Sequence, residues 1–529
     1  MFVEDLRNDF YNVLLGNRVL LLVHYDVDAI CTCKILQGLF KCDNISYTLV
    51  PVGGVSELKT AYEENNEEIK YVVLVNCGGT IDLVDILQPE EDVVFFVLDS
   101  HKPTDVCNVY SDGQVRLVYK DSEENIPNFD DIFRDDEEEE NEEQLESGME
   151  ALEAAVERRR ERRAWEEKRH TLMFNYTQFS YYGKPSSCVA LELSWMVSRC
   201  GWAALWAAAV GAAAAAALQQ RPPARCLLDA ELLQRLLAGG QLGADASCRV
   251  VLEKDAWLPL YREWSLEAAL SHAPAVAPRL RLHTLAGAAR LRQLLADMGY
   301  PLQQARQAFR AMDVELRGAL VAALEAGVGR AGLPAPARAC FLLRRPLRRP
   351  RAALDLVYVV MALIEHDTIP RGEGFQQALD VLEVAGEDSE AISVGLEAAR
   401  RALSEVARIV NATLSARALH LAGPFAYFTI TQGRGPLWLG AAGRWAAAAL
   451  GGARPVVCCL AREAQPHCLL LGVPPRHDHE PRNLFGAAFE QAATKSGVSV
   501  SLDHMDSSVI TLPVSQRAQF LDALTALLA

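Results

Sequence analysis

Acidic side chains and a histidine follow apolar runs in the first fifth of the chain, each at the point where a run ends. Carboxylates and imidazole are ligands that Mn²⁺, Mg²⁺ and Zn²⁺ accept in proteins, and two such ions close together would activate water for phosphoester hydrolysis. The residues concerned are Asp26, Asp28, Asn76, Asp99 and His101. Their pattern makes metal-dependent hydrolysis the first hypothesis to test.

The ligand set is too small for that chemistry. A two-metal site needs several anionic ligands, one of them shared between the ions. Asn76 is neutral where a bridging acid would be most useful, and Ser100 separates Asp99 from His101. Three carboxylates and one imidazole are few for two divalent ions, so we expect no bound metal, no cofactor and no catalysis. The alternative interpretation is a polar network at the ends of strands.

The apolar runs themselves are rich in Val, Leu, Ile and Phe, which is typical of strands covered on both faces. They span residues 19–24, 45–52, 71–76 and 93–98. Helix-like stretches at 29–41 and 55–66 lie between them, and this alternation predicts parallel βαβ units in an open α/β sheet. Ligands of such sheets bind at the carboxyl ends of the strands, so the polar residues should meet at one edge.

Length and charge limit the remaining function classes. A chain of 529 residues predicts two or three domains, and its net charge of −17 argues against a protein that simply coats nucleic acid. The first nine residues carry acids and no apolar core, so we expect no export signal and an intracellular protein. The 13 cysteines contain no Cys-x-x-Cys pair and are interpreted as reduced, mostly buried thiols.

Three features invite a functional interpretation that we do not favour. Residues 202–218 are dominated by alanine and predict a buried helix rather than a membrane span. Trp195, Trp202 and Trp206 have helix-like spacing and are interpreted as packing residues rather than base-stacking groups. The run from His477 to Glu480 follows two prolines in a predicted surface loop, and we do not expect it to bind metal.

Charged segments divide the chain. Nine of the twelve residues in 135–146 are acidic, which predicts a solvated loop or linker. A helical stretch follows with a basic block, which is either a nuclear localisation signal or an exposed face paired with nearby glutamates. The block consists of Arg158, Arg159, Arg160, Arg162 and Arg163. Residues 344–351 hold five arginines and two prolines and predict a loop, which could touch phosphate or act as a hinge.

The rest of the chain predicts one helical and one mixed domain. Residues 226–340 have helical periodicity with prolines at segment ends, which predicts an all-helical insertion. A long helix is expected from 352 to 403, and a closing amphipathic helix at 516–528. An α+β domain between them should contain strands at 425–431, 456–460, 468–473 and 498–502 and a helix at 483–495.

The polar motifs resemble those of the DHH phosphoesterases, the superfamily of the RecJ single-strand exonuclease. The matching motifs are Asp26-Val27-Asp28, Asn76-Cys77-Gly78 and Asp99-Ser100-His101. Active relatives carry Asp in place of Asn76 and His in place of Ser100, and the glycine-rich, histidine-containing motif of their C-terminal domain is not evident. The resemblance implies that Asp26, Asp28, Asn76, Asp99 and His101 are the remnants of a metal site.

A more specific resemblance covers most of the chain. It is carried by residues 26–36, 85–89, 96–101, 261–266, 295–302, 309–313 and 483–490. These segments are similar to the cell division control protein 45 family of eukaryotic replication factors. The resemblance implies a DHH-type parallel-sheet domain, a helical insertion that contacts the MCM ring, and a C-terminal DHHA1-like α+β domain. The expected boundaries are 1–133, a linker at 134–170, completing helices at 171–225, the insertion at 226–350, and 351–529.

The function that this resemblance implies is non-catalytic. Such a chain would join the MCM ring and the GINS complex in the replicative helicase, meet replication initiation factors at origins on chromatin, and work in the nucleus without a membrane. Single-stranded DNA could enter the groove between the α/β domains. Two alternatives stay open: an active metal-dependent phosphoesterase or single-strand exonuclease, and an acidic chaperone for basic proteins that relies on 135–146.

Overall fold

The N-terminal sheet in this computed structural model has five parallel strands in the order β2-β1-β3-β4-β6. The strands are β1 (Arg18–His24), β2 (Ser46–Val52), β3 (Tyr71–Val75), β4 (Val94–Leu98) and β6 (Val115–Leu117). The structure describes residues 1–529 except 112, 135–148, 240–247, 331–336, 385–388, 464 and 477–481. The predicted parallel α/β sheet is therefore confirmed, and the acidic run 135–146 lies outside the described residues.

Helices cover both faces of this sheet, which explains why its central strands are apolar throughout. Val19, Leu21 and Val23 face one core, and Leu20 and Leu22 face the other. The first core is closed by α2 (Val27–Cys42), α9 (Ser186–Met196) and α10 (Trp202–Ala217), and the second by α3 (Val55–Asn65) and α4 (Leu83–Leu87). The short helix α5 (Val106–Tyr110) precedes β6.

The alanine-rich segment is the buried helix α10. It packs against α2, α9, α11 (Pro223–Ala238) and α17 (Ala353–Ile364), a close approach that small side chains permit. Trp206 is fully buried, and Trp195 and Trp202 are partly buried against the same core, as expected for packing residues. None of the helices in the described part of the chain is long and apolar enough to cross a membrane.

The middle region is helical, but the prediction of an all-helical insertion was wrong in one respect. It contains a three-stranded antiparallel sheet in the order β10-β9-β8, made of β8 (Arg249–Ala256), β9 (Ala337–Arg344) and β10 (Arg351–Ala352). Val250 of β8 and Leu343 of β9 are buried in the same core as α10. Burial in this core stabilises the two strands, although the local sequence has helical periodicity. The helices are α12 (Leu266–His272), α13 (Ala277–Leu280), α14 (Leu285–Asp297), α15 (Leu302–Arg306) and α16 (Val314–Arg330).

The C-terminal part is mixed α+β, as predicted, with one difference among its strands. Its sheet has the order β11-β12-β13-β14-β15. The strands are β11 (His420–Ala422), β12 (Phe425–Ile430), β13 (Val456–Leu460), β14 (His467–Val473) and β15 (Val509–Pro513), with helices α20 (Pro436–Ala449), α21 (Phe485–Ser496) and α22 (Arg517–Leu528). The strand predicted at 498–502 is only an isolated antiparallel bridge from Ser501 to Thr511 of β15.

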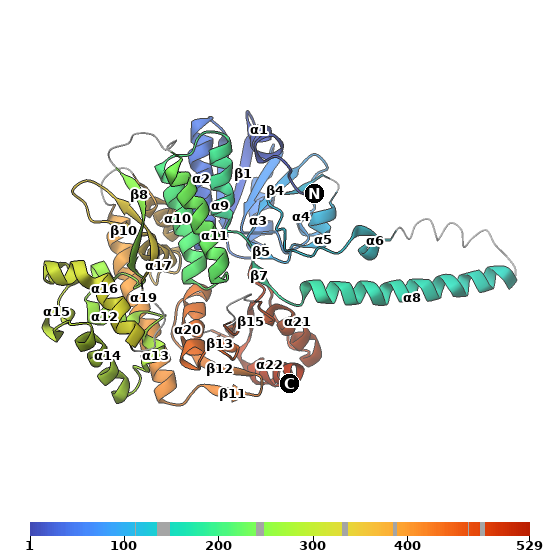
Figure 1. The fold of residues 1–529 in the computed structure, drawn as a ribbon. Coiled ribbons are helices and arrows are strands. Elements are labelled where there is room, and N and C mark those ends of the chain that lie inside the picture. Colours follow the sequence, from blue (N-terminus) through green and yellow to red (C-terminus); the bar gives the residue numbers. More distant parts are fainter. Residues whose placement is uncertain are drawn as a thin grey trace.

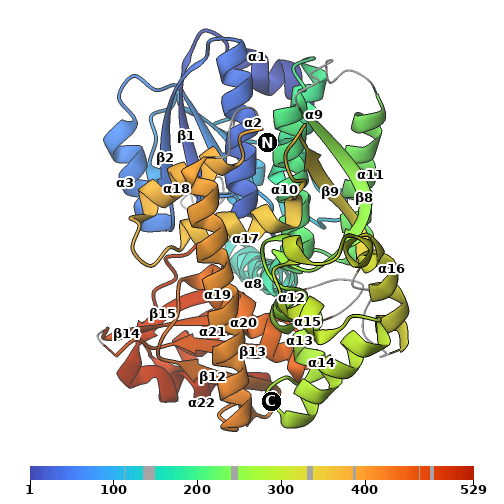
Figure 2. The ribbon, with the colours of Figure 1, turned by 90° about the vertical axis from the view of Figure 1, so that its left-hand side faces the viewer.

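The long helix expected over 352–403 is three helices instead. They are α17, α18 (Arg371–Val381) and α19 (Glu390–Ser415). Figure 2 shows α19 running from beside the N-terminal sheet down to the C-terminal sheet, with the helical region on its other side. The helices α17 and α19 pack on each other and connect the parts of the molecule.

One helix extends away from the body. Figure 1 shows α8 (Met149–Thr177) projecting to one side, with the body of the protein only at its C-terminal end. Near that end, Lys168 forms an ion pair with Asp131 at 2.6 Å and Tyr176 donates a hydrogen bond to Glu124. The basic block lies on the projecting part, where Arg162 forms an ion pair with Glu166 at 3.3 Å.

Candidate functional site

The first carboxylate of the site is fixed by the start of a helix. Asp26 follows β1 and caps α2, where its Oδ1 accepts a hydrogen bond from the backbone N–H of Ala29 at 2.8 Å. Asp28 lies in the first turn of the same helix. The unpaired N–H groups and the positive end of the helix dipole favour negative charge at this position.

Asn76 lies between the two carboxylates. It adopts a left-handed backbone with φ 51°, a conformation that Asn tolerates better than most residues. Its side-chain amide donates to Asp26 Oδ2 at 3.2 Å and to Asp28 Oδ2 at 3.1 Å. Its Oδ1 accepts from the backbone N–H of Ser100 at 3.2 Å and from the hydroxyl of Ser186 at 2.5 Å. The neutral amide therefore joins three of the predicted polar segments.

Asp28 receives further donors from the start of α9. The backbone N–H of Ser186 donates to Oδ2 at 2.8 Å, and the hydroxyl of Ser187 donates to Oδ1 at 2.5 Å. Burial raises the pKa of Asp28 to about 6, and the neighbouring charge of Asp26 adds to the increase. Sequence reasoning missed both serines, although Pro185-Ser186-Ser187 at the start of a helical stretch was a signal for an N-terminus.

Asp99 and His101 form a second pair close by. Asp99 accepts hydrogen bonds from the backbone of Gly79 at 2.9 Å and from His101 Nδ1 at 2.7 Å. Burial raises the pKa of Asp99, but the charge and hydrogen bond of His101 outweigh this and hold it below its ordinary value. Burial lowers the pKa of His101, and Asp99 outweighs that effect and raises it to about 9.

A histidine links the two pairs. His24 Nδ1 lies 3.0 Å from Asp26 Oδ2, and the ring centroids of His24 and His101 are 6.0 Å apart. Burial raises the pKa of Asp26, but the hydrogen bond and charge of His24 and the charge of His101 leave it lowered. Sequence reasoning missed His24, although it stands only two residues before Asp26.

The structure thus brings all five predicted residues to one edge of the sheet. We call Asp26, Asp28, Asn76, Asp99 and His101 the carboxylate cluster. Its carboxylates are bonded to amide, hydroxyl, imidazole and backbone donors of the chain itself. Within the described residues, no three His, Cys, Asp or Glu side chains are grouped so that they could hold a metal ion. The predicted absence of a metal site at 477–480 falls outside the described residues.

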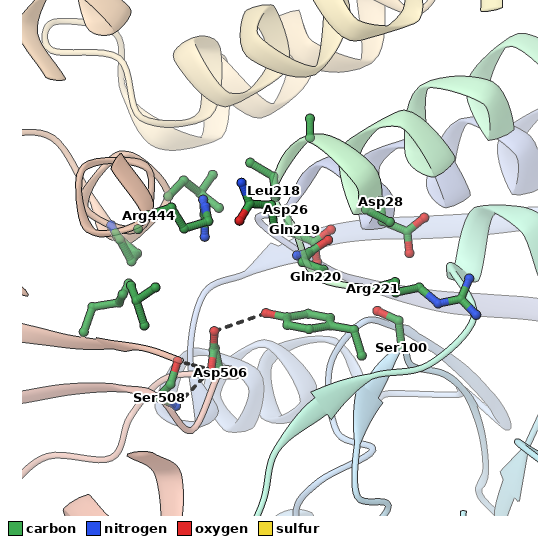
Figure 3. Close-up of a pocket in the computed structure, with 18 of the residues that line it drawn as sticks. Asp26, Asp28, Ser100, Leu218, Gln219, Gln220, Arg221, Arg444, Asp506 and Ser508 are labelled. Atoms are coloured by element: carbon green, nitrogen blue, oxygen red, sulfur yellow. Dashed lines mark hydrogen bonds between the residues drawn. The ribbon is translucent and has the colours of Figure 1, made fainter. Parts of the chain in front are cut away.

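The carboxylate cluster opens into a cavity of about 1440 Å³ that lies between the N-terminal and C-terminal sheets. Figure 3 shows Asp26, Asp28 and Ser100 on one side and Arg444, Asp506 and Ser508 on the other. Tyr182 spans the gap and donates to Asp506 Oδ2 at 3.1 Å. The end of α10, around Leu218 and Gln219, lines the cavity between them (Figure 3). The polar edge therefore faces a large groove.

The sequence and the fold were compared with known proteins. The CDC45 family model matches residues 19–158, 134–373 and 370–527. The human protein "Cell division control protein 45 homolog" is 36% identical over 574 aligned positions that cover 100% of both chains. The crystal structure of CDC45 from Entamoeba histolytica has a TM-score of 0.74 at 18% identity and covers 100% of both chains. A manganese-bound RecJ exonuclease reaches a TM-score of 0.45 at 13% identity, covering 98% of this chain and 92% of that one.

Proposed function

The chain belongs to the cell division control protein 45 family, a family of DNA replication factors, and on that premise we propose that it is a non-catalytic subunit of the replicative DNA helicase. It would act with the MCM ring and the GINS complex in both initiation and elongation of chromosomal replication. The observation that carries this proposal is the full-length match to the family, which includes the helical region and the C-terminal sheet.

The internal bonding of the carboxylate cluster supports a role without catalysis. A metal-activated hydrolase needs carboxylates that are free to bind the ions. Here the amide of Asn76 donates to both Asp26 and Asp28, and Ser187 donates to Asp28 as well. The cluster would then serve to fix the start of α2 and α9 against the sheet.

Exposed apolar side chains support the helical region, residues 226–350, as the surface for the MCM ring. Leu285 is 93% exposed and Val314 is 71% exposed, each at the first position of its helix. A contiguous apolar surface marks a site for a protein partner, and we propose that these two side chains belong to such a surface. We place GINS and the replication initiation factors on other faces of the same chain.

Nuclear action and contact with DNA complete the proposal. The basic block at Arg158, Arg159, Arg160, Arg162 and Arg163 projects on α8, where an import receptor could reach it. The chain would bind origins and chromatin as part of the pre-initiation complex. Single-stranded DNA would enter the cavity between the two sheets, where Arg444 supplies a positive charge.

Assembly of the helicase tests the MCM surface. A variant with Leu285→Glu and Val314→Glu should fail to comigrate with the MCM ring and GINS in gel filtration, because it places charge on the apolar contact. The matched control is Leu421→Glu, since Leu421 is 63% exposed on the far sheet. Normal assembly of the double variant would exclude this surface.

The phosphoesterase alternative has its own test. The purified chain with Mn²⁺ should leave a labelled single strand intact over hours. Degradation that disappears in Asp26→Ala would show that the cluster is an active metal site and would replace the non-catalytic proposal. Degradation that persists in Asp26→Ala would come from a contaminating nuclease.

A further inference from the structure

The central cavity contains three arginines that form no ion pair in the described part of the chain. Arg338, Arg444 and Arg476 line the cavity, and we call them the arginine wall. Their guanidinium groups also donate no hydrogen bond to the described residues. The guanidinium carbon of Arg338 lies 5.4 Å from the ring centroid of Trp257, a contact that positions this side chain. Arginine stays charged at neutral pH, so the arginine wall is a set of uncompensated positive charges.

The other charged groups of the cavity are bonded within the chain. The remaining arginines are Arg221 with Asp229, Arg371 with Glu57, Arg434 with Asp367, and Arg462 with the carbonyl oxygens of Gly433 and Arg434. Among the acids, Glu365 accepts a hydrogen bond from the backbone N–H of Leu437 and Asp503 accepts one from that of Ser56, both at 2.8 Å. An anion that enters the cavity therefore meets free positive charge at the arginine wall.

A tyrosine separates the arginine wall from the carboxylate cluster. Tyr182 pairs with His101 across two short strands, β5 (His101–Lys102) and β7 (Tyr181–Tyr182). Its hydroxyl donates to Asp506 at 3.1 Å, and the charge of Asp506 acts on Arg444 without forming an ion pair. Figure 3 shows Arg444 and Asp506 on the side of the cavity opposite Asp28. The Tyr182–Asp506 hydrogen bond thus lies between the two sets of charges.

The arginine wall is long enough for several phosphates. Arg444 lies on α20, and Gly452, just beyond the end of this helix, also lines the cavity. The backbone N–H of Arg476 donates to the carbonyl oxygen of Gly452 at 2.8 Å. Eight residues at helical spacing span roughly 12 Å, whereas successive phosphates of one strand lie about 3.4 Å apart along a duplex axis. The charge of Arg476 adds to burial in lowering the pKa of Arg338, so these two guanidinium groups lie close together.

The chemistry of the two sides selects the ligand and its path. Carboxylates without a metal ion repel phosphate, so the carboxylate cluster disfavours a polyanion, and the arginine wall attracts one. Guanidinium groups fit phosphate oxygens in a bidentate manner. The aromatic rings of Tyr181, Tyr182 and Trp257 also line the cavity. A positive groove with aromatic side chains is the combination that binds single strands, because the bases stack on the rings.

We propose that single-stranded DNA follows the arginine wall, with its phosphates at Arg444, Arg476 and Arg338, and bypasses the carboxylate cluster. This inference rests on the proposed entry of single-stranded DNA into the cavity, and it assigns the residues and the path. The strand would run along α20 and leave between the loop after β14 and the middle sheet. The sheet strand β9, which carries Arg338, would thereby join the DNA site.

Salt-dependent binding of oligothymidine by the full chain tests the residues. Fluorescence anisotropy would compare affinities at about 50 and 200 mM salt, where each lost phosphate contact lowers the salt slope by about 0.7. The variant Arg338→Gln, Arg444→Gln, Arg476→Gln should therefore reduce the ratio of the two affinities by about 20-fold. The variant Arg338→Gln, Arg476→Gln keeps the more buried Arg444 and should reduce the ratio by about sevenfold.

The control is Arg279→Gln, Arg290→Gln, Arg292→Gln, which has the same net charge as the triple variant and changes no residue of the cavity. It should leave the ratio unchanged. An unchanged ratio in both arginine-wall variants would overturn the proposal, and so would an equal decrease in the control. Loss of polyglutamate binding with oligothymidine binding intact would assign the wall to an acidic protein instead.

Photo-crosslinking of a strand that carries a photoreactive thymidine tests the path. Crosslinks mapped by mass spectrometry should fall on Trp257 and on residues 448–452 and 474–476, and crosslinks confined to 26–28 and 99–101 would contradict the path. The triple variant should still comigrate with the MCM ring and GINS. A failed DNA result with normal assembly would therefore remove this inference and leave the helicase role intact.

Discussion

Replacing Asn76 by Asp would convert the neutral member of the carboxylate cluster into the acid that active relatives of the DHH type carry. The change removes the amide that donates to Asp26 and Asp28 and adds a buried charge beside them. Hydrogen bonds to charged groups contribute about 1.5–3 kcal/mol each, so we expect Asn76→Asp to lose about 3–5 kcal/mol of unfolding free energy at pH 7. This is a large part of the roughly 5–15 kcal/mol that stabilises a typical domain.

The loss should depend on pH and on metal. The pKa of Asp28 is about 6 in the folded chain, above its unfolded value, so its charge costs stability above pH 6 and this cost disappears as the pH falls toward 4. The penalty of Asn76→Asp should therefore be smaller at pH 5 than at pH 7. With a fourth carboxylate in the cluster, Mn²⁺ at 100 times its Kd should restore about 2.7 kcal/mol of unfolding free energy.

Urea unfolding with and without Mn²⁺ would measure both effects. The matched control is Asn108→Asp, because Asn108 is fully buried and its amide donates to the carbonyls of Gly78 and Ile81 rather than to carboxylates. The control should also lose stability but gain none from Mn²⁺. The reasoning is refuted if Asn76→Asp and the unaltered chain unfold at the same urea concentration at pH 7 without metal. The hydrogen bonds from the Asn76 amide to Asp26 and Asp28 would then not stabilise the fold.

Three further predictions concern the pair at His101, the packing of α10 and the basic block. The pKa of His101 is raised to about 9, so its pairing with Asp99 contributes about 3 kcal/mol to the unfolding free energy, fully present below pH 6.5 and lost as the pH rises through 9. In urea unfolding, His101→Gln should therefore lose more stability at pH 6 than at pH 9.5. An equal loss at both pH values would refute the pairing. A Cβ at Gly211 would overlap Ser187 and lie 2.8 Å from Asp28 Oδ1, so Gly211→Ala should reduce the unfolding free energy by about 1–3 kcal/mol and lower the melting temperature. In the control Gly38→Ala the new Cβ meets nothing within 4 Å, so the melting temperature should rise slightly. Replacing Arg159, Arg160 and Arg163 by Gln should reduce the nuclear fraction of a fluorescent fusion several-fold, and an unchanged fraction would leave the block as an exposed helical face.

The N-terminal sheet could be predicted because its information is local. Its strands are buried on both faces and therefore form short continuous apolar runs that the chain itself displays. The rule that ligands meet at the carboxyl ends of parallel strands then placed Asp26, Asp28, Asn76, Asp99 and His101 on one edge. The alternation of strands and helices was sufficient for this step.

The middle sheet could not be predicted in the same way. β8 and β9 pair Arg249 with Arg344, residues separated by almost a hundred positions, and only this pairing gives Val250 and Leu343 their place in the core. The Ala, Leu and Arg residues around them favour helix in isolation. Tertiary pairing overrides that preference. The donors at Ser186 and Ser187 were missed for a related reason, because α9 meets Asp28 only after the chain has folded.

Unwinding of a forked DNA by a reconstituted helicase tests the central claim most directly. The MCM ring and GINS would be mixed with ATP and the DNA, with and without this chain. We expect the rate of strand separation to be low without the chain and to rise when the chain is added. A folded Asp26→Ala chain should raise the rate as much as the unaltered chain does. An equal rate without the chain would contradict its role as a helicase subunit.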